Sequence, residues 1–325
     1  MKISVRSYAK INLGLRIGRL REDGFHDLHT VYQTIALHDR VSVKASPGSG
    51  ITITSSNPAV PTDSSNTCYR MAERALDVVK KRVHLEIHIE KRLPLQGGLG
   101  AASANAVAAL LGIERVLKTS IPMPEKLLLA AEVGSDVPLF LVGGTILGVG
   151  RGEQVYALED LPAMPCVVVT PEVGVSTPQA FRDWDFIRAQ DRAGQLTSSA
   201  GSHTMNMHGH AESAWLWAKA SYSGVSARSR NRAETPLLDL VRAGIENDFE
   251  YVVFPKHPEL RKVKSVLVEH GASYAALSGS GSSLFGLFAS KSKAEAAARK
   301  LQKQGLAAHA THTLTRRQYW AGMFR

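Results

Sequence analysis

Apolar and polar residues alternate along much of the first half of the chain. Such a period-two pattern predicts strands, because successive side chains of a strand point to opposite faces, whereas apolar residues with a period near 3.6 predict helices. The strands are expected at 2–7, 11–18, 31–37, 40–45, 50–54 and 84–90, the helices at 66–80, 102–117 and 124–134, and a glycine-rich hairpin at 143–153.

The second half begins with the apolar strand 166–170. Its pattern predicts helices at 236–247, 258–270 and 292–305, a strand–loop–strand unit over 274–288, and a last strand near 308–314. Strands and helices alternate without a regular parallel repeat, which predicts an α+β fold. We expect two domains, 1–160 and 161–325.

One segment of the second half has no clean period. Residues 183–232 are polar and rich in Ser and Ala. Long loops without secondary structure are uncommon inside compact domains, so this segment is expected to be a flexible insertion.

The composition is that of an ordinary globular protein, with 44% hydrophobic and 21% charged residues among 325. No apolar run is long enough to span a membrane, and the first strand begins where a leader peptide would stand. Cys68 and Cys166 lie in apolar surroundings far apart in the sequence. This usage favours reduced core cysteines and a cytoplasmic, bacterial protein.

The net charge of +10 suits anionic partners such as nucleotides and phosphorylated metabolites. The basic residues are scattered, and aromatic residues make up only 6% of the chain. Single-stranded nucleic acid is usually bound by aromatic side chains set beside basic ones. The charge pattern therefore argues against a nucleic-acid partner.

A glycine-rich stretch, "QGGLGAASAN" at 96–105, precedes the helix predicted at 102–117. The first N–H groups of a helix have no partner within the helix, and the helix dipole is positive there. Glycines at 97, 98 and 100 would leave these donors open to an anion, which predicts a phosphate cradle. The stretch matches neither a P-loop nor GxGxxG, and an ordinary strand-to-helix turn is the alternative.

Five blocks of the sequence together resemble the GHMP kinases, the superfamily of galacto-, homoserine and mevalonate kinases. They are "SYAKINLGL" at 7–15, "REDGFHDLHTVYQ" at 21–33, "PLQGGLGAASAN" at 94–105, "GSDVPLFL" at 134–141 and "ALSGSGSSLFG" at 276–286. The second block resembles the subgroup whose acceptor is linked to cytidine diphosphate.

The resemblance implies an N-terminal domain like domain 2 of ribosomal protein S5 and a C-terminal ferredoxin-like domain. It implies ATP-dependent phosphorylation of the 2-hydroxyl of a cytidine diphosphate-linked sugar alcohol, in the non-mevalonate route to isoprenoid precursors. ATP and this alcohol would be the partners, with neither a membrane nor nucleic acid involved. A monomer and a homodimer both remain open.

Phosphoryl transfer to an alcohol requires bound phosphates and a group that accepts the hydroxyl proton. Asp136 follows Gly134 and Ser135 and precedes a proline, so it is expected in a turn. The resemblance implies that Asp136 is the general base and that Lys10 lies beside it. The alternatives are a simple turn aspartate and a surface lysine on an edge strand.

The same resemblance implies an acceptor site in which aromatic rings stack on cytosine and a histidine hydrogen-bonds it. Phe25 stands where a tyrosine is frequent, so the stacking surface is kept without the hydroxyl. The acceptor-site residues expected on this basis are Asn12, Phe25, His26, Tyr32, Arg151, Thr177 and Phe181.

On the donor side, the glycine-rich stretch is expected to surround the ATP phosphates, and Asn66 is expected near adenine or as a helix N-terminal residue. The residues concerned are Pro94, Leu95, Gln96, Gly97, Gly98, Leu99, Gly100, Ala101, Ala102, Ser103 and Ala104. Ala101 and Ala102 stand where many GHMP kinases have serines, one of which binds Mg²⁺. No protein ligand for a metal is therefore assigned, and Mg²⁺ is expected to be held mainly by ATP and water.

Two other functions are compatible with the pattern. Another GHMP kinase, acting on homoserine or a mevalonate derivative, would not need a cytosine site. A basic RNA-binding module with the same N-terminal fold would bind RNA in a salt-sensitive way and would not turn over ATP.

Overall fold

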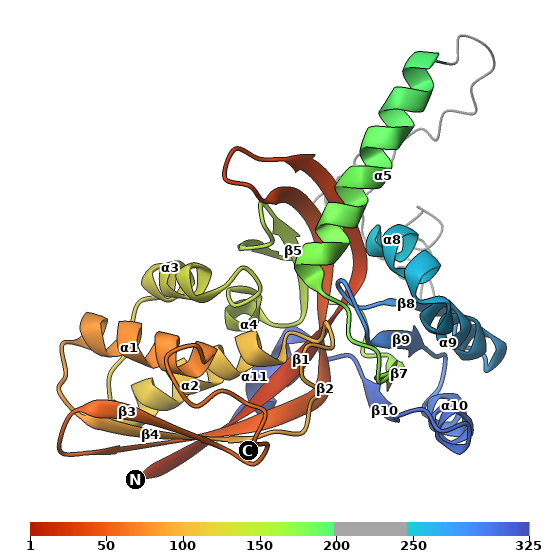
Figure 1. Ribbon diagram of the computed structural model, residues 1–325. Helices are drawn as coiled ribbons and strands as arrows, with labels where there is room; N and C mark the ends of the chain where they lie inside the picture. The colour runs from red at the N-terminus through yellow and green to blue at the C-terminus, as the bar shows by residue number, and fades with distance from the viewer. Residues whose placement is uncertain (198–245, 325) are drawn as a thin grey trace.

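The computed structural model describes residues 1–197 and 246–324 (Figure 1). A long antiparallel ribbon of β1 (Lys2–Leu20) and β2 (His26–Ser46) runs through the molecule. One end of the ribbon belongs to the first sheet, and the other end reaches the second half of the chain. No helix within the described residues is both long and apolar enough to cross a membrane.

The first sheet is six-stranded, in the order β3-β4-β2-β5-β6 with β1 paired to β2. Its other strands are β3 (Gly50–Ser55), β4 (His84–Glu90), β5 (Thr145–Val149) and β6 (Gln154–Ala157). The helices α1 (Thr67–Val79), α2 (Ala101–Leu117), α3 (Met123–Val133) and α4 (Leu139–Val142) lie on one side of it (Figure 1). The expected S5-like half is confirmed.

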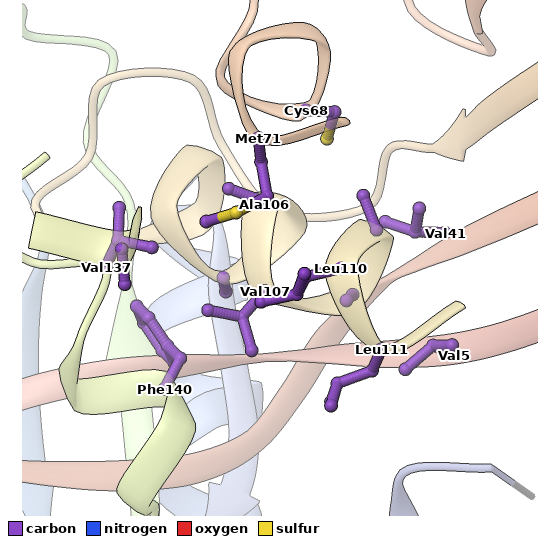
Figure 2. Close-up of a cluster of buried hydrophobic side chains, with 14 of the residues drawn as sticks. Val5, Val41, Cys68, Met71, Ala106, Val107, Leu110, Leu111, Val137 and Phe140 are labelled. Atoms are coloured by element: carbon purple, nitrogen blue, oxygen red, sulfur yellow. The ribbon is translucent and has the colours of Figure 1, made fainter. Parts of the chain in front are cut away.

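Helix α2 forms the centre of the first core (Figure 2). Ala106, Val107 and Leu110 are fully buried, and small side chains let the helix approach the sheet closely. At Gly112, an added Cβ would lie 2.6 Å from a methyl of Val43. This packing fixes the N-terminus of α2 against the ribbon.

The second sheet is four-stranded, in the order β10-β7-β9-β8. Its strands are β7 (Pro165–Val169), β8 (Tyr274–Leu277), β9 (Leu284–Leu287) and β10 (Ala308–His312), and the helices beside it are α8 (Phe249–Lys256), α9 (Pro258–Glu269) and α10 (Lys291–Lys303). Strand and helix order along the chain is that of a split βαβ unit, so the predicted ferredoxin-like half is confirmed.

Alternate residues of β7 pack on the two faces of this sheet. Val167 and Val169 belong to the cluster formed with α9 and α10, whereas Cys166 and Val168 pack against ribbon residues such as Ile11. The ribbon is thereby held between the two halves, which fixes the position of any residue on its strands.

The strands predicted at 31–37 and 40–45 are one strand, β2, and helix α8 was not predicted. Two other expected elements also differ from the structure. The strands predicted at 2–7 and 11–18 are one strand, because β-bulges between Tyr8 and Lys10 and between Asn12 and Gly14 absorb the break in the alternation without ending the strand. Residues 183–197 of the expected insertion are not loop but continue helix α5 (Thr177–Thr197). The rest of that segment, and most of the helix predicted at 236–247, lie outside the described residues.

The cause of the second difference is a short apolar stripe on α5. Ala180, Trp184 and Ile187 recur at helical spacing and pack into the core of the second half. The other residues of the helix are mostly polar, so the stripe is inconspicuous in the sequence.

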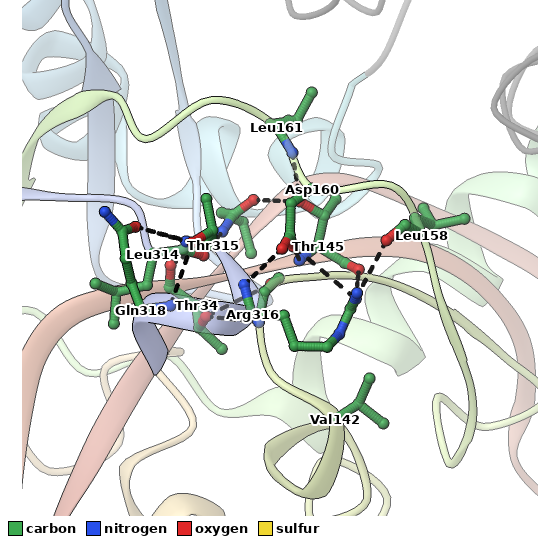
Figure 3. Close-up of polar contacts among 12 residues, drawn as sticks. Thr34, Val142, Thr145, Leu158, Asp160, Leu161, Leu314, Thr315, Arg316 and Gln318 are labelled. Atoms are coloured by element: carbon green, nitrogen blue, oxygen red, sulfur yellow. Dashed lines mark hydrogen bonds and ion pairs between the residues drawn. The ribbon is translucent and has the colours of Figure 1, made fainter. Parts of the chain in front are cut away.

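The last helix, α11 (Arg316–Gly322), returns to the first half. Arg316 anchors its start: its backbone N–H donates to Asp160 (2.6 Å), whose other carboxylate oxygen accepts from Thr145 N (3.1 Å) (Figure 3). The Tyr319 hydroxyl donates to the carbonyl of Phe140 (2.6 Å). The domain boundary expected at residue 160 stays a prediction, but the chain crosses it again at its C-terminus.

Candidate active site

The predicted phosphate loop leads directly into α2. Gly100 is the N-cap of this helix with φ 69°, and no side chain caps the helix in the part of the chain that the structure describes. The first-turn N–H groups of α2 therefore remain available at the positive end of a 17-residue helix. This is the geometry that binds phosphate groups elsewhere.

The glycines of this loop are needed for a reason that the sequence did not indicate. A Cβ on Gly98 would lie 2.1 Å from the carbonyl oxygen of Ser278, and one on Gly100 would lie 2.8 Å from the ring of Phe140. Both residues also have positive φ. Close packing against neighbouring backbone and ring therefore excludes side chains at these two positions.

The Gly-Ser loop at 278–283, within the last of the five blocks, contacts the phosphate loop. Ser283 N donates to the carbonyl of Gly97 (3.2 Å), and the Ser278 hydroxyl donates to that of Gly98 (3.0 Å). Since the two loops come from different halves, the phosphate cradle depends on both.

A cavity of ≈ 310 Å³ opens on the donor side of the loop. Its walls include Asn66 and all the predicted loop residues from Pro94 to Ser103, and also Val60, Pro61, Ile89, Lys91 and Asn105, which the sequence did not single out. Ala104 does not line the cavity but is buried in the first core.

Asn66 both caps α1 and lines this cavity. Its side-chain oxygen accepts from Cys68 N (2.8 Å), and its amide nitrogen donates to the carbonyl of Pro61 (2.6 Å). The capping alternative for this residue is therefore what the hydrogen bonds show.

A buried carboxylate anchors the chain just before the phosphate loop. Asp39 is fully buried and accepts hydrogen bonds from Lys91 Nζ (2.8 Å), Asn105 Nδ2 (3.0 Å) and the backbone N–H groups of Arg92 and Leu93 (both 2.7 Å). Burial lowers the pKa of Lys91, and the charge of Asp39 partly offsets this.

The catalytic pair expected from the sequence is brought together. Lys10 Nζ lies 3.5 Å from Asp136 Oδ2 and donates to Asn12 Oδ1 at 2.7 Å. Lys10 is 3% exposed, and burial lowers its pKa, which Asp136 raises in part. The two β-bulges of β1 lie on either side of Lys10 and Asn12, as bulges often do where a strand must aim a side chain at a site.

Asp136 lies in the turn between α3 and α4, closed by a hydrogen bond from Val137 N to the Gly134 carbonyl (3.0 Å). The hydroxyl of Tyr32 donates to its Oδ1 (3.1 Å), while Oδ2 faces Lys10. Burial, together with the charge of Asp136, raises the pKa of Tyr32 well above its ordinary value. Tyr32 therefore stays protonated and orients the carboxylate.

A second cavity, of ≈ 350 Å³, lies on the other side of this pair. The predicted acceptor residues Asn12, Phe25, His26, Tyr32, Arg151, Thr177 and Phe181 all line it, with Lys10 and Asp136. Residues that the sequence did not single out for the site include Leu15, Leu28, Ser135, Phe249, Gly279 and Ser280.

The two cavities meet at the phosphate loop. Gly98, Gly100 and Ser103 line both of them. A phosphate chain held by the start of α2 would therefore end beside Lys10 and Asp136, at the edge of the second cavity.

Aromatic side chains form the far end of the second cavity. Phe25 is 50% exposed, and the Arg151 guanidinium lies 5.0 Å from its ring centroid. The ring of His26 stacks on Phe181 with centroids 5.0 Å apart and planes at 9°. Phe181 lines the cavity as expected, and His26 covers one of its faces.

Helix α5 closes this end from the second half. The Thr177 hydroxyl lies 2.6 Å from that of Ser280, and Asp185 Oδ1 lies 2.8 Å from His26 Nε2. Asp185 was not predicted from the sequence. It lies one helical turn beyond Phe181, so the two side chains share one face of α5.

Comparisons with known proteins agree with this geometry. Residues 66–144 match the GHMP kinases N terminal domain, and residues 233–307 match the GHMP kinases C terminal family. The chain is 36% identical over 284 residues to the 4-diphosphocytidyl-2-C-methyl-D-erythritol kinase of Solibacter usitatus, covering 87% of this chain and 80% of that protein. It is 30% identical over 298 residues to the enzyme of the same name from Caldicellulosiruptor saccharolyticus, covering 92% of each.

A solved structure is similar over the whole length. The crystal structure of a 4-(cytidine 5'-diphospho)-2C-methyl-D-erythritol kinase superposes with a TM-score of 0.71 at 29% sequence identity, covering 96% of this chain and 99% of that one.

Proposed function

This chain belongs to the GHMP kinases, among the 4-diphosphocytidyl-2-C-methyl-D-erythritol kinases, and from that membership we propose how its residues carry out the reaction. The enzyme transfers the γ-phosphoryl group of ATP to the 2-hydroxyl of 4-diphosphocytidyl-2-C-methyl-D-erythritol, in non-mevalonate isoprenoid precursor synthesis. The observation that carries the assignment of residues is the 3.5 Å approach of Lys10 and Asp136 where the two cavities meet.

ATP occupies the donor-side cavity, with its phosphates at the start of α2. The free N–H groups of the first turn and the helix dipole bind the phosphate oxygens. The γ-phosphoryl group then lies next to Lys10, whose ammonium group offsets the negative charge that is shared by the phosphates and Asp136.

Asp136 is the general base. The acceptor hydroxyl oxygen forms a bond to the γ-phosphorus, the bond from that phosphorus to the β–γ bridging oxygen breaks, and the hydroxyl proton passes to the Asp136 carboxylate. Tyr32 and Lys10 each hold one of the carboxylate oxygens, so the base is oriented before the substrate binds.

Asp136 is the one carboxylate among the described residues that line the acceptor cavity. Mg²⁺ commonly binds through one or two carboxylates together with substrate phosphates and water. This lining suits a metal held mainly by ATP and water, near Asp136 and Ser103. When bound, Mg²⁺ neutralises charge on the phosphate oxygens.

The diphosphate and cytosine of the acceptor lie toward Phe25, His26 and Phe181. Arg151, beside Phe25, supplies positive charge near the diphosphate. Phe25 offers an exposed ring for stacking, and His26 offers one ring nitrogen for a hydrogen bond to the base. We also place the enzyme in the bacterial cytoplasm, which is supported by its buried free thiols and its bacterial relatives.

The test is ADP release by the purified enzyme with ATP and each of three acceptors: the cytidyl substrate, homoserine and mevalonate. We expect turnover with the cytidyl substrate alone and competitive inhibition by CDP against it. Turnover of homoserine or mevalonate, with no inhibition by CDP, would overturn the assignment of the acceptor.

A further inference from the structure

The imidazole of His26 is held from two sides by one helix. Phe181 stacks on its face, and Asp185, four residues later on α5, lies 2.8 Å from its Nε2. His26 is 6% exposed, while the Asp185 side chain is 48% exposed. The contact joins the start of β2, in the first half, to a helix of the second half.

Hydrogen-bond chemistry decides which ring nitrogen carries a proton. An ionised carboxylate can only accept, so a hydrogen bond to Asp185 requires a proton on Nε2. In the neutral ring, Nδ1 is then a pure acceptor. Nδ1 has no hydrogen-bond partner among the described residues, so it is available to a ligand in the cavity that His26 lines.

Helix α5 is fixed firmly enough to hold Asp185 in place. Its first residue, Thr177, contacts Ser280 at 2.6 Å, and Asp183 pairs with Lys256 of α8 at 2.6 Å. Phe181 packs edge-on against Phe249, with ring centroids 5.0 Å apart. These three contacts hold the helix at successive points along its first two turns.

We propose that Asp185 is a positioning residue of the acceptor site, which fixes the orientation and tautomer of His26 so that Nδ1 is presented to the pyrimidine base. This inference rests on the proposed function, since it takes His26 to bind the base. Asp185 itself touches neither substrate nor the reacting atoms, and acts only through the histidine. The same hydrogen bond would also link base recognition to the placement of α5 over the cleft.

The test compares Asp185→Asn and Asp185→Glu with a matched control, Gln190→Glu, which makes an amide–carboxylate exchange at an exposed position of the same helix. An asparagine can donate as well as accept, so it no longer requires a proton on Nε2. Side-chain ¹⁵N NMR of the free enzyme reports the tautomer directly, and the His26 signals are those that disappear in His26→Gln. Steady-state kinetics give KM for the cytidyl substrate and for ATP.

We expect His26 to carry its proton on Nε2 in the wild type, in Gln190→Glu and in Asp185→Glu, and to become a mixture of tautomers in Asp185→Asn. KM for the cytidyl substrate should rise roughly tenfold in Asp185→Asn, as for loss of one hydrogen bond to a buried group, with KM for ATP and kcat unchanged. The glutamate variant should recover most of this loss.

Unchanged His26 shifts and an unchanged acceptor KM in Asp185→Asn would overturn the role of Asp185. A rise in KM for ATP equal to that for the acceptor would overturn it too, since it would indicate a general change of the cleft. Failure of the wild type to use the cytidyl substrate would instead refute the proposed function, and the NMR result does not depend on that substrate.

Discussion

At the scale of single residues, the site depends on a buried lysine beside a partly exposed carboxylate, Asp136. Lys10 faces Asp136 and Asn12, and burial lowers its pKa from the ordinary value of 10.5. The ammonium group of Lys10 is held in position before the phosphates bind. Little reorganisation of the site therefore accompanies the reaction. The same burial makes the charge of Lys10 sensitive to alkaline pH.

The first prediction concerns this pH dependence. The charged form of Lys10 is needed for activity, so the alkaline fall of kcat/KM should begin at lower pH than an exposed lysine would give. The contribution of Lys10 to the free energy of unfolding should instead increase as the pH rises. Because the pKa is lower in the folded state, the unfolded chain binds more protons between the two pKa values, and the contribution of Lys10 to stability rises with pH through that window.

The measurement is the pH profile of kcat/KM for the wild type, together with the free energy of unfolding of the wild type minus that of Lys10→Met. Lys262→Met, at an exposed position on α9, is the control. A wild-type-minus-variant difference that is flat with pH, or that falls as pH rises, would contradict the prediction.

The second prediction concerns the base. Asp136→Asn keeps an oxygen to accept from Tyr32 but cannot take up the hydroxyl proton at neutral pH. We expect kcat to fall about 100- to 10,000-fold, with KM for ATP within about threefold of the wild type. Asp77→Asn, at an exposed position of α1, should match the wild type. Near-normal turnover of Asp136→Asn would remove the residue from the base role.

At the scale of elements, the phosphate cradle is shaped by contacts between two loops. Gly98 touches the backbone of Ser278, which lies in the other half of the molecule. Asn247, which is 1% exposed, holds the same Gly-Ser loop from behind, since its amide nitrogen donates to the carbonyls of Leu277 (2.8 Å) and Gly279 (2.7 Å). The conformation of one loop therefore sets that of the other.

The third prediction tests this interlock. Gly98→Ala adds a methyl 2.1 Å from the Ser278 oxygen at φ 73°, so one of the loops must move. We expect a loss of about 2–5 kcal/mol in the free energy of unfolding and weaker ATP binding. Gly305→Ala has a similar φ of 81° with nothing within 4 Å, and should cost about 1–2 kcal/mol without changing ATP affinity. Equal losses in the two variants would show that contact with Ser278 is unimportant.

The elements also show what could be read from the sequence. Alternation and helical periodicity gave most strands and helices, because each of these elements buries one continuous face. Helix α5 was missed because its buried face comprises only a few residues, and the single strand β1 because its bulges interrupt the alternation. These two elements lie at the site and carry Lys10, Asn12, Phe181 and Asp185.

Contacts between segments that are distant in the sequence were the hardest feature to predict from it. The blocks of sequence indicated which residues belong to the site, but not that His26 covers Phe181 or that Asp185 meets His26. Ala104 illustrates the opposite error, since it follows the loop in sequence yet turns into the core. The packing of α2 decides which of its first residues face the cavity, and this packing cannot be predicted from a single sequence.

At the scale of the whole molecule, helix α11, from the end of the described chain, packs against the first half. Arg6 N, on β1, donates to the carbonyl of Met323 (2.7 Å), just after α11. The second half lies between these two segments in the sequence. Helix α11 therefore completes the core beside α4, directly behind the turn that carries Asp136.

The fourth prediction follows from this closure. Tyr319 and Met323 are each 1% exposed, and loss of one buried aromatic side chain alone costs about 3–5 kcal/mol. Whole domains are stable by only about 5–15 kcal/mol. A chain ending at Thr315 should therefore lose cooperative thermal unfolding by circular dichroism, and with it kinase activity, although every proposed site residue is still present.

Two point variants test whether the loss of stability comes from the packing of α11 and not from any change near the C-terminus. Tyr319→Phe removes only the hydrogen bond to Phe140 and should cost about 1–2 kcal/mol with activity retained. Phe324→Ala, at a side chain that is 40% exposed, should cost less than about 1 kcal/mol. If the truncated chain unfolds at the wild-type temperature, α11 is an appendage, and the first half is complete without it. If it unfolds at a lower temperature or without cooperativity, residues 1–160 are not a complete unit, because their core also requires residues of α11.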